Sequence, residues 1–308
     1  MPFFSIIIPV YNRSLFIKDA INSIQNQTFE DWECIVIDDG STDESSLVVK
    51  KIIEADNRIQ YIYQENSERS VARNNGIRNS KGQYICFLDS DDSYLENHLQ
   101  VLYHEIKIKT SPIAFFFTNY LLSQKGEIQR QDLPKLEGDL ISYLFYNPII
   151  PARVCIHSRI LQEDLFDEEV VIVEDLLLWV RIALKHPVFQ IELSTVIYNI
   201  HDDNSVNIQN NAATKRLNGL KVFKKKYPKI MTEIPSKIWG DVFGDTHFNV
   251  MKYYIYKNQN RLAFKHLFLS IIYQKINIHF KHKIYVMRSL LFNKKIPEYH
   301  VKSEGEDL

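Results

Sequence analysis

The stretch YICFLDSDD, residues 84–92, sets an apolar run directly before three carboxylates in four positions. A continuous apolar run of this length is typical of a strand that is buried on both faces of a sheet. Two earlier stretches have the same form: FFSIIIPV at 3–10 is followed by YN, and WECIVI at 32–37 is followed by DDG. Each apolar run is therefore predicted to be a buried strand that ends in polar residues.

Helical periodicity fills the intervals between these runs. We expect helices over residues 15–26 and 67–79, a further strand at 59–63, and a helix that Ser41 caps, with Glu44 completing a capping box. Strands that alternate with helices in this way predict an α/β fold with a mostly parallel, doubly wound, Rossmann-like sheet flanked by helices. Ligands of such sheets bind beyond the carboxyl ends of the strands, where the polar residues of this chain collect.

Charge divides the 308-residue chain into two regions. Residues 1–208 hold 18 Lys and Arg against 31 Asp and Glu, whereas residues 209–308 hold 19 against 7. We therefore expect an acidic α/β domain over 1–208 and a basic helical region over 209–308. An apolar fraction of 45% and a charged fraction of 24% argue against a collagen, a coiled coil or a wholly disordered chain.

The cysteines and the N-terminus indicate a cytoplasmic protein. Cys34, Cys86 and Cys155 lie in apolar stretches without metal-type spacing, so we expect buried, reduced thiols. The first residues lack a basic region and their apolar run stops at Pro9, which predicts a first strand and not a signal peptide. No stretch approaches the roughly 18 apolar residues that a membrane span needs.

The acidic stretch after residue 88 is the strongest chemical signal. Asp89, Asp91 and Asp92 would repel one another unless a cation lay among them. A hard divalent ion with oxygen ligands, Mg²⁺ or Mn²⁺, fits such a cluster. The alternative is a solvated acidic turn that caps a helix beginning near Tyr94. Because no glycine-rich phosphate loop follows the first strand, a pyrophosphate bound here would depend on the ion.

Three further positions are candidates for chemistry, and each has a plain structural alternative. Asp38 and Asp39 could accept a uracil imide or a ribose hydroxyl, or they could simply form a strand-to-helix turn. Glu174 and Asp175 head a very apolar helix, where a carboxylate could act as a general base or merely offset the helix dipole. His201 could bind a metal, although a lone histidine usually has no such role.

Together these features resemble the inverting family 2 glycosyltransferases, which have the GT-A fold and build bacterial surface polysaccharides. The resemblance covers residues 3–206, about two thirds of the chain. Six pieces in the family's order are specific for the family, although not for the sugar that is moved. They are SIIIPVYNR at 5–13, IVIDDGSTDES at 35–45, ENSERSVARNNGI at 65–77, YICFLDSDD at 84–92, VEDLLLWVRI at 173–182 and YNIHDDNSV at 198–206.

The resemblance implies a role for each matching position. Asp175 would be the catalytic base, with Glu174 beside it, and Asp91 and His201 would bind Mn²⁺ or Mg²⁺. The family usually has glycine where this chain has Glu68, which would alter the local turn. The residues implied to hold the donor nucleotide, with Asp89 on its ribose, are Pro9, Tyr11, Asp38, Asp39, Arg73, Asp89 and Ser90.

The implied reaction is a single displacement that inverts the anomeric carbon. The donor would be a nucleoside diphosphate sugar, expected to be UDP-linked, and the acceptor a hydroxyl of a surface polysaccharide or lipid-linked oligosaccharide. Asp175 would take the hydroxyl proton, while the metal and His201 neutralise charge on the leaving nucleotide. Two alternatives stay open: a non-catalytic sugar-nucleotide-binding or scaffold protein on the same fold, and a haloacid-dehalogenase-type phosphatase with Asp89 as nucleophile.

The basic C-terminal region suggests an anionic partner. Residues 246–297 contain ten Lys and Arg, no Asp or Glu, and many aromatic and aliphatic side chains. Helices of this composition can lie in a membrane interface, which would hold the protein at the inner membrane face. The alternative is that the apolar face packs on the acidic domain or on a second subunit of a homo-oligomer. Because no nucleic-acid-binding motif is present, we expect no nucleic-acid partner.

Overall fold

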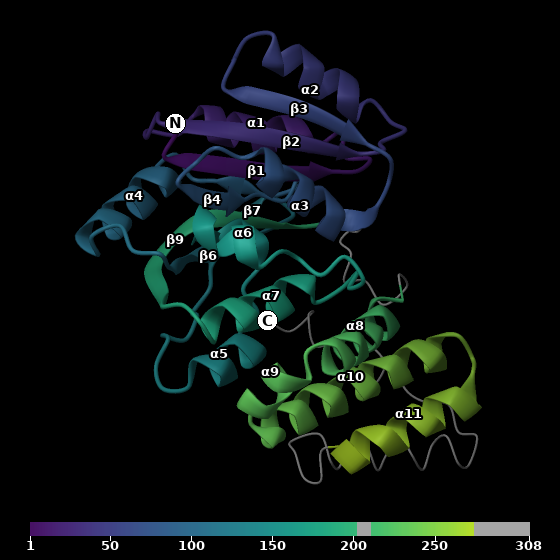
Figure 1. The fold of residues 1–308 in the computed structure, drawn as a ribbon. Coiled ribbons are helices and arrows are strands. Elements are labelled where there is room, and N and C mark those ends of the chain that lie inside the picture. The colour runs from purple at the N-terminus through teal and green to yellow at the C-terminus, as the bar shows by residue number, and fades with distance from the viewer. Residues whose placement is uncertain (202–210, 274–308) are drawn as a thin grey trace. The chain divides into compact units, whose positions relative to one another are not determined.

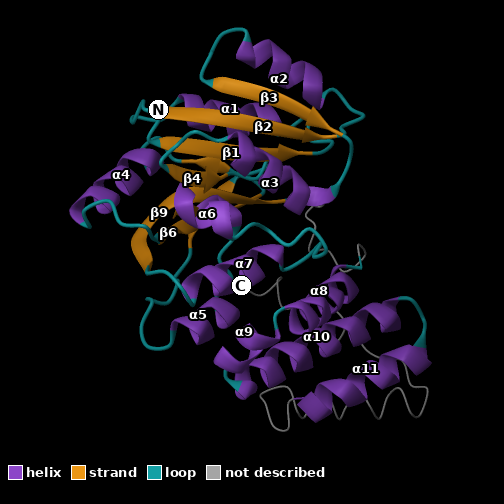
Figure 2. Cartoon of the chain, viewed as in Figure 1, coloured by secondary structure: helices purple, strands orange, loops and turns teal. Residues whose placement is uncertain are grey.

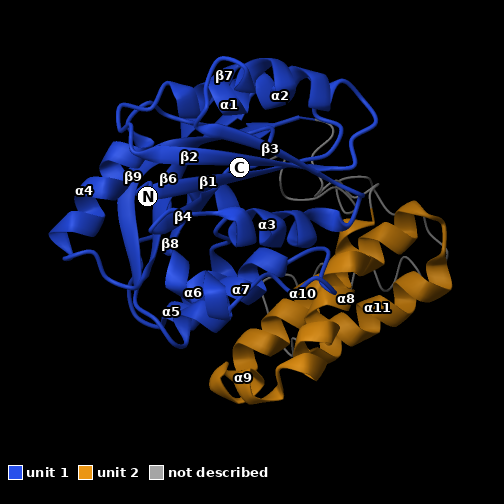
Figure 3. Ribbon diagram, turned by 45° about the horizontal axis from the view of Figure 1, so that its top comes forward, with its two compact units in different colours: residues 1–201 blue, residues 202–308 orange. Residues whose placement is uncertain are grey.

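The computed structural model describes residues 1–201 and 211–273. These residues belong to two compact units, 1–201 and 202–308, which Figure 3 colours separately. The predicted domain boundary at residue 208 lies outside the described residues.

The first unit is built on one sheet with helices against both of its faces (Figures 1 and 2). Its elements in chain order are β1 (Phe4–Val10), α1 (Ile17–Gln25), β2 (Trp32–Asp39), α2 (Ser45–Ile53), β3 (Ile59–Gln64), α3 (Glu68–Asn79), β4 (Tyr84–Phe87), β5 (Ser93–Tyr94), α4 (His98–Ile108), β6 (Phe115–Gln124), β7 (Glu127–Arg130), α5 (Leu140–Tyr146), a 3₁₀ turn (Pro151–Arg153), β8 (Val154–His157), α6 (Ser158–Glu163), α7 (Glu174–Ala183) and β9 (Val188–Ile200).

The strand order places the predicted polar ends together. Among the described residues the sheet runs β3-β2-β1-β4-β8-β6-β9-β5, with β7 paired to β6. Strands β1 to β4 are parallel, and Ile7 of β1 pairs with both Ile35 of β2 and Phe87 of β4. β8 lies antiparallel between β4 and β6, which makes β6 parallel to β4. The expected α/β, mostly parallel sheet is confirmed, and the carboxyl ends of β1, β2 and β4 share one edge.

Alternate residues of the central strands pack on opposite helical layers, because successive side chains of a strand point to opposite faces. On one face Ile6 and Cys34 belong to the core that α1, α2 and α4 complete. On the other face Ile35 and Ile37 contact Ala72 of α3. The sheet is therefore covered on both sides, as its continuous apolar strands predicted.

The element ends refine the sequence predictions. Six of the seven strands and helices expected before residue 90 are found within two residues of their predicted bounds, and the exception is α2. The predicted capping box is wrong: α2 begins at Ser45, because the Ser41 hydroxyl accepts the backbone N–H of Asn12 at 3.1 Å instead of capping a helix. The helix expected near Tyr94 begins only at His98, since Tyr94 pairs in β5. All three cysteines are buried and free, as predicted.

The described part of the second unit is helical. Its core joins Phe248 and Met251 to Ala263 and Leu267. No helix within residues 1–201 or 211–273 is long and apolar enough to cross a membrane. The helices are α8 (Ala212–Lys226), α9 (Pro228–Glu233), α10 (Ser236–Tyr256) and α11 (Asn260–Tyr273).

Candidate active site

Asp38 fixes the turn at the end of β2. Its side chain is fully buried, and it accepts hydrogen bonds from the Tyr61 hydroxyl at 2.7 Å and from the backbone N–H of Ser41 at 2.8 Å. The Asn12 side chain, from the loop after β1, accepts the backbone N–H of Thr42 at 2.8 Å. These contacts tie the loops after β1 and β2 to each other. Asp38 therefore has a structural role: it stabilises the loops that form this edge of the site.

Asp39 and Tyr11 are candidates on adjacent strand ends, where the Asp39 carboxylate is buried and only the Tyr11 ring is open. The Asp39 carboxylate accepts hydrogen bonds from the Gln64 amide at 2.7 Å and from the backbone N–H of Ser67 at 2.9 Å, which fixes its orientation. Tyr11, just after β1, is 47% exposed, and Pro9 pairs with Ile37 inside the sheet. An open aromatic ring and a fixed carboxylate on adjacent strand ends can hold a planar base.

Glu68 keeps a backbone conformation that glycine favours. Its φ is +73°, in the left-handed region, although its side chain is a long carboxylic acid. A non-glycine residue in that region costs roughly 1–2 kcal/mol. The substitution therefore changes the side chain and not the glycine-type turn that begins α3.

The second residue of the acidic turn lies against His201. The His201 Nε2 atom is 3.1 Å from the Asp91 carboxylate, and the Arg13 Nε atom is 3.5 Å from the same oxygen. The His201 ring stacks on Phe16, with the ring centroids 4.7 Å apart. The Asn199 amide also donates to the backbone carbonyl of Asp91 at 2.7 Å. The end of β9 is thus anchored over the acidic turn.

The pKa of Asp92 reflects the repulsion among the three carboxylates that the sequence predicted. It is buried and accepts the backbone N–H of Asn199 at 3.0 Å. Burial raises the pKa of Asp92 well above its usual value, and the charges of Asp89 and Asp91 raise it further. Its Oδ2 atom is buried and has no hydrogen-bond partner among the described residues. A cation at this turn would relieve both the repulsion and the unsatisfied oxygen.

The donor atoms of this turn suit a hard divalent ion. Asp91 and Asp92 offer carboxylate oxygens, and His201 offers an imidazole, a combination that Mn²⁺ and Mg²⁺ accept. Over residues 1–201 and 211–273, however, no group of three or more His, Cys, Asp and Glu side chains is gathered closely enough to hold a metal. The residues fit the ion in their chemistry, and the unsatisfied Asp92 oxygen supports that fit.

Arg73 joins two of the candidate carboxylates. Its side chain is only 2% exposed, and its two terminal nitrogens lie 2.8 Å from Glu174 Oε1 and 2.7 Å from Asp89 Oδ1. These contacts link α3 to both the end of β4 and the start of α7. Because each terminal nitrogen already has a carboxylate, the structure favours a positioning role for Arg73.

Asp175 lies in the first turn of α7, immediately after this ion pair. The preceding Val173 has a left-handed φ of +70°, which turns the chain sharply into the helix. One Asp175 oxygen accepts the backbone N–H of Leu176 at 2.7 Å. Burial, together with the charge of Glu174, raises the pKa of Asp175 to about 7, although Arg73 opposes the shift. A carboxylate with this pKa can exchange protons near neutral pH.

The structure therefore assembles the predicted residues in three groups. Arg73, Asp89, Glu174 and Asp175 form one group, and Asp38 and Asp39 form a second at the end of β2, which β1 separates from β4. Asp91, Asp92 and His201 form another, while Ser90 is buried between the acids. Around Asp91 and His201 the sequence reasoning missed contacting residues that lie within or beside a matching piece: Arg13, Phe16 and Asn199.

Comparison with known proteins identifies the family. The sequence profile described as "Glycosyl transferase family 2" matches residues 5–131. The chain is also 31% identical over 217 residues to a GalNAc(5)-diNAcBac-PP-undecaprenol beta-1,3-glucosyltransferase of Campylobacter jejuni, an alignment that covers 68% of each chain. The chain belongs to glycosyltransferase family 2.

Other relatives match over different lengths. An uncharacterized glycosyltransferase of Rickettsia bellii is 34% identical over 205 residues, which are 65% of this chain and 29% of that protein. The chain spans about a third of the length of the Rickettsia relatives that it matches. Among solved structures, Staphylococcus aureus TarS 1–349 in complex with UDP-GlcNAc has a TM-score of 0.61 at 18% identity, over 96% of this chain and 93% of that one. That likeness confirms the GT-A fold.

The buried Arg73 is expected to be a large contributor to the stability of this family 2 chain. Arg73→Gln leaves Glu174 and Asp89 without their shared cation, so the free energy of unfolding should fall by about 3–5 kcal/mol. Arg78→Gln is the matched control on the same helix, because its ion pair with Glu168 is exposed and should contribute less than about 1 kcal/mol. Urea unfolding followed by circular dichroism measures both; equal losses would contradict the positioning role.

Proposed function

We propose that this chain is an inverting glycosyltransferase that moves a sugar from a nucleoside diphosphate sugar, UDP-linked, to an acceptor hydroxyl. The observation that carries the proposal is Asp175, a carboxylate with a pKa of about 7 at the head of α7, joined through Glu174 and Arg73 to Asp89. Family membership supplies the reaction class, and the titration of Asp175 near neutral pH supplies a base for it.

The proposed step forms one bond and breaks one bond. Asp175 accepts the proton of the acceptor hydroxyl as that oxygen bonds to the anomeric carbon. The bond from the same carbon to the phosphate oxygen breaks, and the nucleoside diphosphate leaves with the electron pair. Because the attack comes from the face opposite the leaving group, the anomeric configuration inverts. Arg73 holds the α7 terminus against Asp89, so that base and donor are positioned together.

Asp91 and His201 are the residues that would hold a divalent ion, Mn²⁺ or Mg²⁺. Such an ion supplies positive charge for the diphosphate oxygens of the donor. The Asp39 carboxylate, fixed by Gln64 and Ser67, would accept the imide N–H of uracil, and Tyr11 would cover the base.

Replacing Asp175 tests the base directly. Asp175→Asn keeps the shape but cannot accept the proton, so hydrolysis of a UDP-sugar should fall by roughly 10²–10⁴-fold. In the wild-type protein the rate should rise with pH and level off above about 7, as Asp175 ionises; the variant should lose this dependence. Asp19→Asn, an exposed acid in α1, is the control. A pH profile that Asp175→Asn leaves unchanged would assign the base elsewhere.

The same pKa predicts the sign of a stability change. Because the folded pKa of Asp175 is raised from 3.8 to about 7, the folded protein holds this proton over a range in which the unfolded chain has lost it. The contribution of Asp175 to stability must therefore fall as pH rises from about 4 to about 7. Unfolding of wild type and Asp175→Asn across this range should show a steeper fall in the wild type, because the variant lacks the contribution of Asp175.

The nucleotide and metal assignments are tested by binding. UDP should bind more tightly with Mn²⁺ than in EDTA, and Asp91→Asn should remove that difference, because Asp91 is a proposed ligand. Calorimetry with UDP and GDP, each with and without the metal, measures the effect. Equal UDP affinity in EDTA would contradict the metal role, and tighter binding of GDP would contradict the uracil assignment.

The relatives suggest the class of acceptor. One is named a glucosyltransferase that acts on an undecaprenol-linked glycan, and a Bacillus subtilis relative, 38% identical over 127 residues, is named a putative teichuronic acid biosynthesis glycosyltransferase. We propose on this basis that the acceptor is a surface polysaccharide or a lipid-linked oligosaccharide.

A stripe on α11 supports a membrane-facing role for the second unit. Phe268 and Ile272 are 55% and 52% exposed, and Arg261 and Lys265 lie on the same face at helical spacing. Aromatic and aliphatic side chains that alternate with cations suit the surface of an anionic bilayer, where each cation adds about 1 kcal/mol of attraction. We propose that this stripe contacts the membrane that carries the acceptor.

Substitution of the stripe should weaken that contact. Phe268→Ser with Ile272→Ser should reduce the fraction of full-length protein that floats with phosphatidylglycerol liposomes at low salt, because the inserted apolar area is lost. Leu193→Ser, which replaces an exposed leucine of the first unit, is the matched control. A wild-type protein that does not float at low salt would contradict the membrane role.

A further inference from the structure

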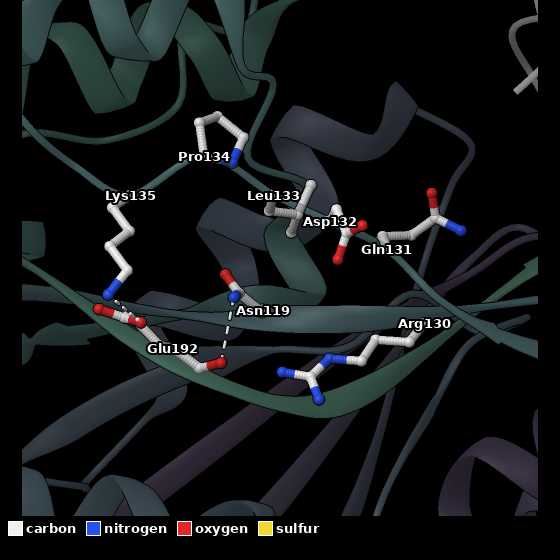
Figure 4. Close-up of a pocket in the computed structure, with 8 residues that line it drawn as sticks. All are labelled: Asn119, Arg130, Gln131, Asp132, Leu133, Pro134, Lys135 and Glu192. Carbon is white, nitrogen blue, oxygen red and sulfur yellow. Dashed lines mark hydrogen bonds and ion pairs between the residues drawn. The ribbon is translucent and has the colours of Figure 1, made fainter.

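A pocket of about 330 Å³ opens on the first unit, away from the residues assigned above. It lies between strands β6 and β9 and the segment 131–135 that crosses them (Figure 4). Its lining is polar: Asn119 lies on the strand floor, with Arg130 on one side of it and Lys135 on the other. Only Leu133 and Pro134 are apolar, so the pocket suits a polar ligand.

Strand register places this pocket toward the same edge of the sheet as the acidic turn. Ile156 of β8 pairs with Ile85 of β4 on one side and with Phe115 of β6 on the other. β4 and β6 are parallel, and Asp89 and Asn119 each follow their paired residue by four positions. Both residues therefore lie beyond the residues that β8 pairs with, toward the same edge of the sheet. A ligand in the pocket can extend toward the donor site.

Arg153 ends the 3₁₀ turn that leads into β8, the strand between β4 and β6. It is 2% exposed, and it donates to the backbone carbonyls of Thr118 at 2.6 Å and Pro148 at 3.3 Å. Its guanidinium lies over the rings of Phe117 and Tyr120. Over residues 1–201 and 211–273, no carboxylate pairs with it, and its Nη2 atom is buried without a hydrogen-bond partner.

Arg153 is connected to the pocket wall. Its charge acts on Tyr143, whose hydroxyl donates to the Pro134 carbonyl at 2.9 Å. Thr118, which accepts from Arg153, directly precedes Asn119 of the floor. Burial lowers the pKa of Arg153 to about 10, which reflects a cation held in a poorly solvated place. The field of such a charge reaches farther than it would in water.

The charges of the lining leave this cation uncompensated. Lys135 and Glu192 form an ion pair at 3.0 Å and largely cancel. Arg130 and Asp132 add one charge of each sign, and neither forms an ion pair with another described residue. The lining itself therefore has two cations and two carboxylates, and the charge of Glu137 also acts on Lys135. Arg153 adds a buried positive charge behind this lining, and no described carboxylate pairs with it.

We propose that this pocket is an acceptor subsite for an anionic sugar, whose carboxylate or phosphate is drawn to Arg130 and to the buried charge of Arg153. The assignment rests on the proposed function, since it names the class of acceptor that the glycosyltransferase would extend. Arg130 offers a planar fork of donors for the anion, while Gln131 and the other polar side chains of the lining suit the sugar hydroxyls.

Two pairs of probes test this without knowledge of the natural acceptor. The first pair is p-nitrophenyl β-D-glucuronide and p-nitrophenyl β-D-glucoside, which differ in one carboxylate. The second is glucose 6-phosphate and glucose, which differ in one phosphate. Calorimetry of the full chain with UDP present should show at least one anionic probe binding about tenfold or more tightly than its neutral partner, because a charge-assisted hydrogen bond is gained.

The variants assign the preference to the pocket. Arg130→Gln, on the surface, and Arg153→Gln, in the interior, should each reduce the preference to within about threefold. Arg159→Gln, an exposed arginine of α6, should leave it unchanged. If Arg153→Gln does not fold, Arg130→Gln alone decides. Equal binding within both probe pairs, binding of no probe, or a preference that survives in Arg130→Gln would overturn the subsite.

Donor hydrolysis separates this inference from the proposed function. Wild-type protein is incubated with UDP-sugars and no acceptor, and UDP release is measured. A preference for an anionic probe without UDP release supports the pocket and contradicts sugar transfer. UDP release without such a preference supports transfer and overturns the anionic subsite.

Discussion

Arg73 carries a positive charge at a position that almost no water reaches, and the arrangement of the site depends on it. Its two terminal nitrogens bind Glu174 at 2.8 Å and Asp89 at 2.7 Å. A buried ion of either sign is costly alone, so each of these groups requires the others to stay in place. The pairing fixes three elements at once: helix α3, the end of β4 and the start of α7. The acidic turn and the proposed base are thereby held as one body.

The pairing also sets the acid–base chemistry of Asp175. Glu174, beside it, raises the pKa of Asp175 through its charge, while Arg73 lowers it, and burial makes the largest contribution. Without Arg73 the two acids would face each other uncompensated, and Asp175 would hold its proton at neutral pH. A single buried cation therefore both positions the base and keeps it able to ionise in the range where it is needed.

The sequence predicted the elements that rest on apolar periodicity, and it missed details that depend on tertiary contacts. Strands such as β1 and β4 are continuous apolar runs, so their identity is local. The cap at Ser41 failed because its hydroxyl accepts from Asn12, 29 residues earlier, a contact that no local pattern contains. Likewise, Tyr94 joins a strand because β9, about a hundred residues later, pairs with it.

The candidate residues were readable from motifs, but their partners were not. The resemblance assigned Arg73 to the nucleotide, whereas the structure shows both of its terminal nitrogens bound to carboxylates. Glu68 departs from the family's glycine, yet its φ of +73° preserves the same backbone conformation. Arg153 lay outside every motif, because nothing in PARV distinguishes a buried arginine from an exposed one. A motif identifies a candidate residue, but its burial and its ion-pair partners depend on the folded chain and cannot be read from the motif.

Two buried arginines in one unit make the physical contrast clear. Arg73 is surrounded by carboxylates, and its charge is satisfied within the chain. Arg153 donates to carbonyls and lies over aromatic rings, and no described carboxylate pairs with it, so its charge is hydrogen-bonded but not neutralised. Desolvation opposes both charges, yet only the first is offset by a counterion inside the fold. A buried cation without a counterion attracts anions to the polar pocket beside it. Because Arg153 does not line the pocket, its charge acts there without occupying the space that a ligand needs.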